Sequence, residues 1–316
     1  MAKRVWASCA ALVVVALGLT VGGSAVAAAP AKTASSQSAA HSGSGPGTGG
    51  ERQLGRVHSS TLPRSSVPGT KKSTSPPAPK AVKPNATYRQ YVAWYGPLTL
   101  PAGTWYEAWA NCPSGMVATG GGESNTSAAG VTLHDTYALS NGTGWKVRVT
   151  NDSTATATFT VYAVCMSGLI AYNQSMGSTD DGGAATATCP TGMQLVGGGG
   201  WSSNPNAVLT MQIGNNWWGA TDYSFHLGTV TGQAICAEGV GNYSQQWANV
   251  TIEPGEYKSA VATCPAGTFV LGGGAHEYEM RPTDSYPAYP AQAWRIWAKN
   301  EWDGGWIVPA VAFCGT

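Results

Sequence analysis

The sequence predicts an all-β protein, with three disulfide-tied antiparallel β repeats in a pseudo-threefold body that follows a disordered N-terminal arm. The motif Cys-Pro-x-Gly-x-x-x-x-Gly-Gly-Gly occurs three times, and its cysteines lie 77 and 75 residues apart. A further cysteine follows each motif behind an apolar strand, which marks internal repeats of supersecondary size. The composition, with 10% charged residues and 42 glycines, is typical of short strands joined by tight turns.

Residues 1–27 are predicted to be a secretory signal peptide. Two basic residues form its charged end, an apolar stretch covers residues 10–21, and Ala-Val-Ala at 25–27 is the expected cleavage motif. A transmembrane anchor is the alternative, but the apolar run is too short to span a bilayer comfortably. Removal of the signal takes Cys9 away and leaves six cysteines, an even number that indicates disulfides in a secreted protein.

Residues 28–87 form the predicted disordered arm. They contain no aromatic residue and are dominated by Ala, Ser, Thr, Gly, Pro and Lys. Such a segment buries too little apolar surface to offset the entropy lost on ordering. The arm carries eight Lys or Arg residues against Glu51 alone, whereas residues 88–316 carry seven basic and fifteen acidic residues. A basic arm is therefore joined to an acidic body.

One island of the arm, residues 51–68, places aliphatic side chains among arginines. It is interpreted either as part of the linker or as a short recognition segment that becomes ordered on a partner. In the second case the aliphatic side chains would enter a groove or add a strand, and the arginines would meet acidic groups. The expected docking residues are Arg52, Leu54, Arg56, Val57, Leu62 and Arg64.

The predicted β body, residues 88–316, divides into repeats at 88–167, 168–238 and 239–316. In each repeat a half-buried strand leads to the cysteine, a Pro-Gly turn follows, and a short apolar strand ends in the glycine triplet. Glycines weaken a strand, so the triplets are expected where strands of one unit cross close against their neighbours. A phosphate-binding loop is the alternative, but no Lys-Ser/Thr and no helix pattern follows the triplets.

An aromatic strand comes next in each repeat, and a cysteine-bearing strand closes it. Trp145, Tyr223 and Trp294 begin the aromatic strands 33, 34 and 30 residues beyond the first cysteine, and their recurrence predicts a structural role. Six cysteines allow fifteen pairings, of which the internal repeat selects one. The predicted disulfides are Cys112–Cys165, Cys189–Cys236 and Cys264–Cys314.

The CPxG…GGG opening, the aromatic strand and the closing VxAxC pattern resemble repeats found in secreted actinobacterial proteins, and this resemblance covers residues 88–316. The layout of an extended N-terminal segment before a β body is similar to that of the adaptor subunits of secreted umbrella toxin particles. That resemblance implies a protein that bridges other subunits of an extracellular assembly. It implies no catalytic residues.

Histidine and serine motifs of known catalytic or metal sites are not found in the sequence. There is no GxSxG elbow, and His276 lacks the second histidine of a zinc-protease helix. His134, His226 and His276 are not at metal-ligand spacing, so each is expected to be structural or incidental at the surface. No metal and no cofactor is expected.

Carboxylates form a separate case, because a glycosidase needs only two of them. Glu277, Glu279 and Asp284 lie close together in the sequence, and Asp180 with Asp181 could contribute to a calcium site. Both groups are interpreted as solvated turn charges. The protein is therefore predicted not to be an enzyme.

Aromatic residues that do not recur between the repeats are the candidate binding residues. Tyr and Trp beside Arg, Asn and Asp stack on sugars and also dominate protein interfaces, whereas local packing is the simpler alternative. The predicted binding residues are Trp217, Trp218, Tyr278, Arg281, Tyr286 and Tyr289.

These observations predict a secreted, non-catalytic adaptor whose β body binds one extracellular protein subunit and whose arm docks on another. A lectin-like module for cell-surface or cell-wall glycans is the second hypothesis, and a carboxylate-based glycoside hydrolase is the third. Nucleic acid is not an expected partner because the body is acidic. Membrane insertion is not expected either.

Overall fold

The computed structural model describes residues 58–59, 88–126, 130–180, 183–222, 228–276, 281–288 and 292–316. The predicted signal peptide and nearly all of the predicted arm lie outside these residues. The described part is all-β: it contains strands and one short 3-10 turn, Ser140–Gly142, and no α-helix. Within that part, no helix has the length and apolar character needed to cross a membrane.

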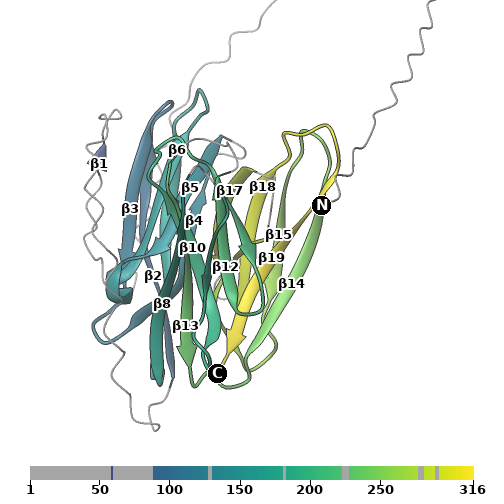
Figure 1. Ribbon diagram of the computed structural model, residues 1–316. Helices are drawn as coiled ribbons and strands as arrows, with labels where there is room; N and C mark the ends of the chain where they lie inside the picture. The colour runs from purple at the N-terminus through teal and green to yellow at the C-terminus, as the bar shows by residue number, and fades with distance from the viewer. Residues whose placement is uncertain are drawn as a thin grey trace, which may run out of the picture. The chain divides into compact units, whose positions relative to one another are not determined.

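Within the described residues, six strands lie in each of the three sequence ranges. The ranges can be followed by their colour in Figure 1. The first range holds β2 (Arg89–Leu100), β3 (Trp105–Asn111), β4 (Val117–Asn125), β5 (Val131–Ala138), β6 (Gly144–Asn151) and β7 (Ala157–Ser167). The second holds β8 (Ala171–Thr179), β9 (Ala185–Thr188), β10 (Gln194–Ser202), β11 (Leu209–Ile213), β12 (Trp217–Asp222) and β13 (Val230–Glu238). The third holds β14 (Ser244–Ile252), β15 (Tyr257–Thr263), β16 (Phe269–Ala275), β17 (Arg281–Ala288), β18 (Ala293–Lys299) and β19 (Trp306–Gly315).

Strand pairing is also the same in each repeat, and all of it is antiparallel. The first, sixth and third strands form one trio, as in β2-β7-β4, and the second, fifth and fourth form another, as in β3-β6-β5. The closing strand, which carries the second cysteine, is always the middle of its trio. Each repeat therefore consists of two small three-stranded units.

The expected pseudo-threefold body is wrong at the level of the sheets. The trios join into four sheets, of seven, six, three and three strands, because neighbouring repeats bond to each other at two places. β5 pairs with β10 at Thr136 and Gly200, and β17 pairs with β4 at Ser285 and Glu123. Between β11 and β16 a side chain takes the place of the backbone pairing, since Nδ1 of His276 lies 2.9 Å from the amide nitrogen of Ile213.

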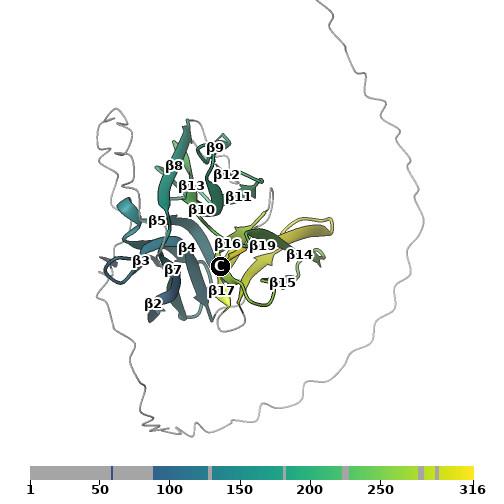
Figure 2. The same cartoon turned by 90° about the horizontal axis from the view of Figure 1, so that it is seen from below.

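The glycine triplets lie where β4, β10 and β16 meet, near the centre of the view in Figure 2. A Cβ added at Gly120 would lie 2.5 Å from Cα of Gly272, and one added at Gly272 would lie 3.2 Å from Cα of Gly197. Backbones this close leave no room for a side chain. The expectation of a close crossing between neighbouring units is confirmed for these first glycines.

The middle glycine of each triplet lies under a tryptophan ring. A Cβ at any of the three would come within 3.0 Å of the indole, so only glycine leaves room for it. The three tryptophan side chains are at most 1% exposed, and they are the largest fully buried side chains of the described residues. The pairs are Gly121–Trp145, Gly198–Trp218 and Gly273–Trp294.

Trp218, and not Tyr223, thus occupies the recurring aromatic position of the second repeat. The indole nitrogen contacts the fourth strand of its own repeat in all three units. That of Trp145 donates to Oγ1 of Thr136 at 2.7 Å, that of Trp218 lies 3.4 Å from the sulfur of Met211, and that of Trp294 donates to Oγ of Ser285 at 3.0 Å. Tyr223 lies outside the described residues. The connection before the aromatic strand is shorter in the second repeat than in the other two. The spacing from the first cysteine therefore predicted a residue too far along the chain.

One disulfide in each repeat joins the cysteine before the Pro-Gly turn to the closing strand, with a Cα–Cα distance of 5.6 Å in every case. The predicted pairing, Cys112–Cys165, Cys189–Cys236 and Cys264–Cys314, is confirmed. Loops of 53, 47 and 50 residues closed in this way each stabilise the fold by roughly 4 kcal/mol in the chain-entropy description. Three such bonds indicate an oxidising environment.

Candidate binding sites

The predicted binding residues that the structure describes do not gather into one site. Trp218 is buried in the core, so its assignment as a binding residue is wrong. Trp217, its neighbour on β12, is half-buried, and its ring folds over the turn at Gly214. Tyr278 and Tyr289 lie outside the described residues.

Tyr286 lies on β17 at the junction with the first repeat. Its ring stacks on that of Tyr162, with 5.8 Å between the ring centroids, and burial raises the pKa of the Tyr286 hydroxyl. The half-buried Tyr286 ring therefore holds two repeats together. This contact accounts for Tyr286 through packing.

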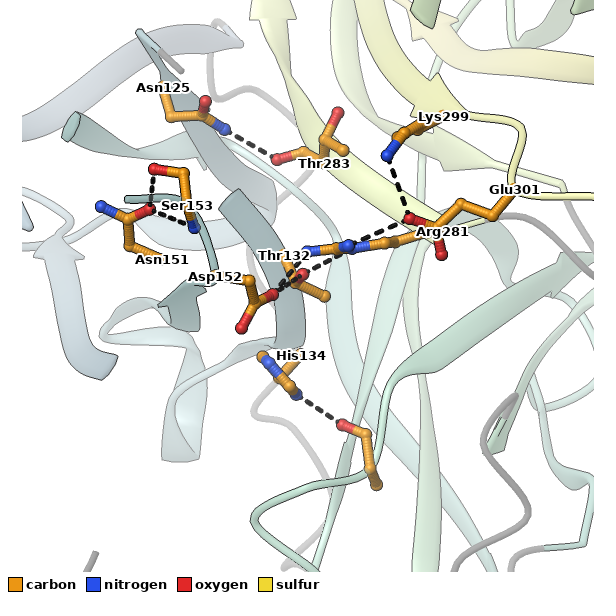
Figure 3. A network of polar contacts seen from close by, with 11 residues as sticks. Asn125, Thr132, His134, Asn151, Asp152, Ser153, Arg281, Thr283, Lys299 and Glu301 are labelled. Carbon is orange, nitrogen blue, oxygen red and sulfur yellow. Dashed lines mark hydrogen bonds and ion pairs between the residues drawn. The ribbon is translucent and has the colours of Figure 1, made fainter. Parts of the chain in front are cut away.

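Arg281, at the start of β17, ties the third repeat to the first through polar contacts (Figure 3). Its Nε donates to Oγ1 of Thr132 at 2.6 Å, and Nη1 donates to Oε1 of Glu301 at 3.1 Å. Its Nη2 forms an ion pair with Asp152, which also accepts from Thr132 at 2.7 Å. The guanidinium is therefore held from three sides.

Arg281 also lines a cleft of about 470 Å³ to which all three repeats contribute. The first repeat supplies Trp105, His134 and Arg148, and the second supplies the loop at 205–208. Arg148 is held in a buried ion pair, with its Nε 3.0 Å from Oδ2 of Asp135. Among the predicted binding residues that the structure describes, only Arg281 lines this cleft.

His134 is buried, which agrees with the structural one of the two roles expected from the sequence. It is the extra residue of a β-bulge between Leu133 and Asp135, and it is only 8% exposed. Bulges redirect single side chains, which is how a residue on an ordinary strand comes to line a cleft. Its Nδ1 donates to the carbonyl of Ala207 at 2.7 Å, and burial lowers the pKa of its ring to about 4. The imidazole is therefore neutral at physiological pH.

The third repeat has the same bulge, but with Thr283 as the extra residue between Pro282 and Asp284. Asp135 and Asp284 follow the two bulges as equivalent buried carboxylates. His134 is thus a residue that does not recur, and only the three-dimensional register reveals it. Spacing within the sequence does not contain this signal.

Asp284 does not form an exposed carboxylate pair of the kind a glycosidase needs. It is 2% exposed, accepts from Tyr257 at 3.0 Å, and lies beside the fully buried Glu123, with Asn125 donating to both. Glu277, Glu279 and Asp181 lie outside the described residues. Across the described part of the chain, no three His, Cys, Asp or Glu side chains are placed to hold a metal ion.

The exposed end of the β18–β19 hairpin carries a cluster of large apolar side chains. We call this cluster the aromatic tip; it consists of Trp302, Trp306 and Ile307, which are 45%, 38% and 62% exposed. The side chain of Asn300 closes the hairpin by donating to the carbonyls of Ile252 and Gly304, at 2.9 and 2.7 Å. Two indoles and an aliphatic side chain thus face solvent within six residues of sequence.

The first repeat builds the same hairpin without these side chains. Asn151 donates to the carbonyls of Leu100 and Ala155 at 2.9 and 2.8 Å, just as Asn300 does in the third repeat. The strand register gives the equivalent positions in the two repeats: β7 begins opposite Leu100, and β19 begins opposite Ile252. The residues of the aromatic tip therefore correspond to small residues in the first repeat. The counterparts of Trp302, Trp306 and Ile307 are Ser153, Ala157 and Thr158. The hairpin fold therefore does not require large apolar side chains there.

No protein-family model and no curated protein matches this chain.

The edge strands carry a second set of exposed apolar side chains, and these do recur. Trp94 on β2, Met176 on β8 and Trp247 on β14 are 50%, 55% and 46% exposed and occupy equivalent positions opposite the closing strands. Recurrence distinguishes them from the aromatic tip, which belongs to one repeat alone. A substitution at one of these recurring positions is therefore a suitable control for a substitution in the aromatic tip.

The predicted docking residues of the arm, Arg52, Leu54, Arg56, Val57, Leu62 and Arg64, lie outside the described residues. Within the same segment, His58–Ser59 form the two-residue strand β1, which pairs antiparallel with β3 opposite Glu107 and Tyr106. The outer edge of β3 is therefore able to accept an added strand.

The buried carboxyls make the free energy of unfolding depend on pH. Burial raises the pKa of Glu123 well above its usual range and raises that of Asp284 from 3.8 to about 6. Both groups bind a proton more tightly when folded, so their stabilising effect is complete below the unfolded pKa and is lost as the pH rises through the folded pKa. His134, whose pKa is lowered, acts in the opposite direction: its stabilising effect is lost as the pH falls from 6.5 to about 4.

Glu123→Gln is expected to raise the free energy of unfolding by about 2 kcal/mol at about pH 7.5 and to change it little at about pH 4. Glutamine resembles the protonated acid, so the variant avoids an ionised carboxyl beside Asp284. Urea denaturation at the two pH values measures both differences, and Glu238→Gln on the exposed end of β13 is the control. If Glu123→Gln were less stable than the parent protein at the higher pH, the ionised Glu123 carboxyl would not be unfavourable beside Asp284.

Proposed function

We propose that this protein is a secreted, non-catalytic adaptor of an extracellular protein assembly. The observation that carries the proposal is the aromatic tip. Two tryptophans and an isoleucine stand exposed where the same hairpin of the first repeat has serine, alanine and threonine. Tryptophan is enriched among the residues that dominate protein–protein binding energies, and exposed apolar clusters mark interaction sites.

The charge distribution supports a second contact made by the arm. The arm has eight basic residues and one acidic residue, whereas the body has seven basic and fifteen acidic residues. If the arm is disordered, as the sequence predicts, its roughly 60 residues would span roughly 40 Å, enough to reach another subunit. The segment 51–68 is proposed to bind there by strand addition, of which the pairing of β1 with β3 is an intramolecular example.

The aromatic tip is tested by giving the third repeat the residues of the first. The triple variant Trp302→Ser, Trp306→Ala, Ile307→Thr should keep all three disulfides and melt within a few degrees of the parent protein. Its affinity for a purified partner subunit, identified from the secreting culture and confirmed with recombinant protein, should fall by at least about tenfold. Surface plasmon resonance at fixed ionic strength measures this change.

Trp94→Met is the matched control, because methionine occupies the equivalent edge position in the second repeat. It removes an indole of similar exposure from a recurring position and should leave partner binding unchanged. Equal binding by the parent protein and the triple variant would refute the aromatic tip as the partner site.

A further inference from the structure

The cleft between the repeats contains polar atoms that no described residue satisfies. Nε1 of Trp105 and Nε2 of His134 are both buried and have no hydrogen-bond partner within the described part of the chain, and both residues line the cleft. A buried polar atom left unpaired destabilises a protein, and most buried polar groups in proteins are paired. Such atoms at the wall of a cleft indicate a ligand that completes them.

The two unpaired atoms have opposite hydrogen-bonding roles. The indole of Trp105 is a donor only. His134 uses its Nδ1 proton for the carbonyl of Ala207, which leaves Nε2 with a lone pair as an acceptor. A hydroxyl group donates and accepts at once, so a ligand with several hydroxyls can satisfy both kinds of atom.

The charged groups around the cleft are paired. Arg148 is paired with Asp135, Arg281 is paired with Asp152 and Glu301, and Lys299 also pairs with Glu301. Neither guanidinium stands as an isolated cation for a phosphate or sulfate. The paired carboxylates and guanidiniums are instead fixed in position, as the donors and acceptors of a site for a neutral polar molecule would be.

We propose that this cleft is a carbohydrate-binding site that holds one or two neutral sugar rings. The half-buried indole of Trp105 offers an aromatic face, Thr104 and Asn206 add a hydroxyl and an amide, and His134 supplies the acceptor at the wall. A volume of about 470 Å³ falls within the usual range of small-ligand pockets, about 300–1,000 Å³. The site shares no residue with the aromatic tip, which begins one residue after Glu301 of its lining, and it does not depend on the adaptor function.

The third repeat provides conservative replacements for testing the cleft. Thr283 occupies the bulge position there, so His134→Thr removes the acceptor while keeping a residue that this bulge accommodates. Trp105→Phe keeps an aromatic ring and removes only the N–H donor. The thermal unfolding of both variants is measured first, and Trp105→Phe decides the matter if His134→Thr does not fold.

The probes are three neutral trisaccharides, built from glucose, mannose or N-acetylglucosamine, titrated to about 10 mM and followed by calorimetry. The parent protein should bind at least one of them. Trp105→Phe should weaken that binding by about fivefold and His134→Thr by about tenfold or more. The triple variant of the aromatic tip should bind as tightly as the parent protein.

Two results would overturn the proposal. One is that the parent protein binds none of the three trisaccharides. The other is that a folded Trp105→Phe or His134→Thr variant binds them as tightly as the parent protein, which would place the sugar elsewhere on the surface.

Discussion

Gly198→Ala is expected to destabilise the protein by about 4 kcal/mol, or to prevent folding, although it adds only one methyl group. The new Cβ would lie within 3.0 Å of three ring atoms of Trp218. That ring is 1% exposed and packs against Phe313, with 6.3 Å between the ring centroids, so core side chains hold it in place. Added volume in a close-packed interior forces backbone shifts or strained rotamers.

Gly304→Ala is the matched control for this substitution. A Cβ at Gly304 would meet nothing within 4 Å, and the backbone there is not in the left-handed region. Guanidinium denaturation of both variants under oxidising conditions gives the two free energies. A Gly198→Ala variant as stable as Gly304→Ala would mean that the tryptophan does not rest on the glycine backbone.

The second large effect separates two neighbouring tryptophans. Trp218→Ala should lower the free energy of unfolding by about 3–5 kcal/mol, because it empties a large fully buried site. Trp217→Ala should cost less than about 1 kcal/mol, since Trp217 is half-buried over a turn. Chemical denaturation of the two single variants measures the difference.

A double variant tests the contact itself. If Gly198 and Trp218 touch as described, adding Gly198→Ala to the Trp218→Ala background should cost much less than about 4 kcal/mol, because the cavity accepts the methyl group. Additive losses in the double variant would contradict direct packing of the ring on the glycine. The same cycle applies to Gly121 with Trp145.

Features that follow from repetition were predictable from the sequence. The three CPxG motifs and their closing cysteines led to the correct disulfides, and the triplets correctly indicated close crossings of the chain. Trp218 was missed because Tyr223, 34 residues beyond Cys189, matches the spacing of Trp145, whereas the shorter loop of the second repeat places the equivalent ring earlier, at Trp218. The length of the preceding loop, which differs between repeats, controls that spacing.

Features that depend on long-range approach were not predictable. The merging of trios into four sheets depends on single backbone pairings such as Ser285 with Glu123, whose partners lie far apart in the sequence. His134 reached the cleft through a bulge, which adds one residue to a strand without a sequence signal of its own. The aromatic tip became recognisable only when Asn300 could be superposed on Asn151 as the side chain that closes the same hairpin.

The contact between an indole and the glycine backbone has a consequence for how this protein could be engineered. Each repeat fixes its two trios with the same pair of residues and the same disulfide, all remote from the hairpin ends. The hairpin ends are therefore interchangeable parts on a constant frame, as the serine, alanine and threonine of one repeat and the aromatic residues of another already demonstrate. Such a frame would allow loops of new specificity to be grafted onto one repeat while the other two keep their original surfaces.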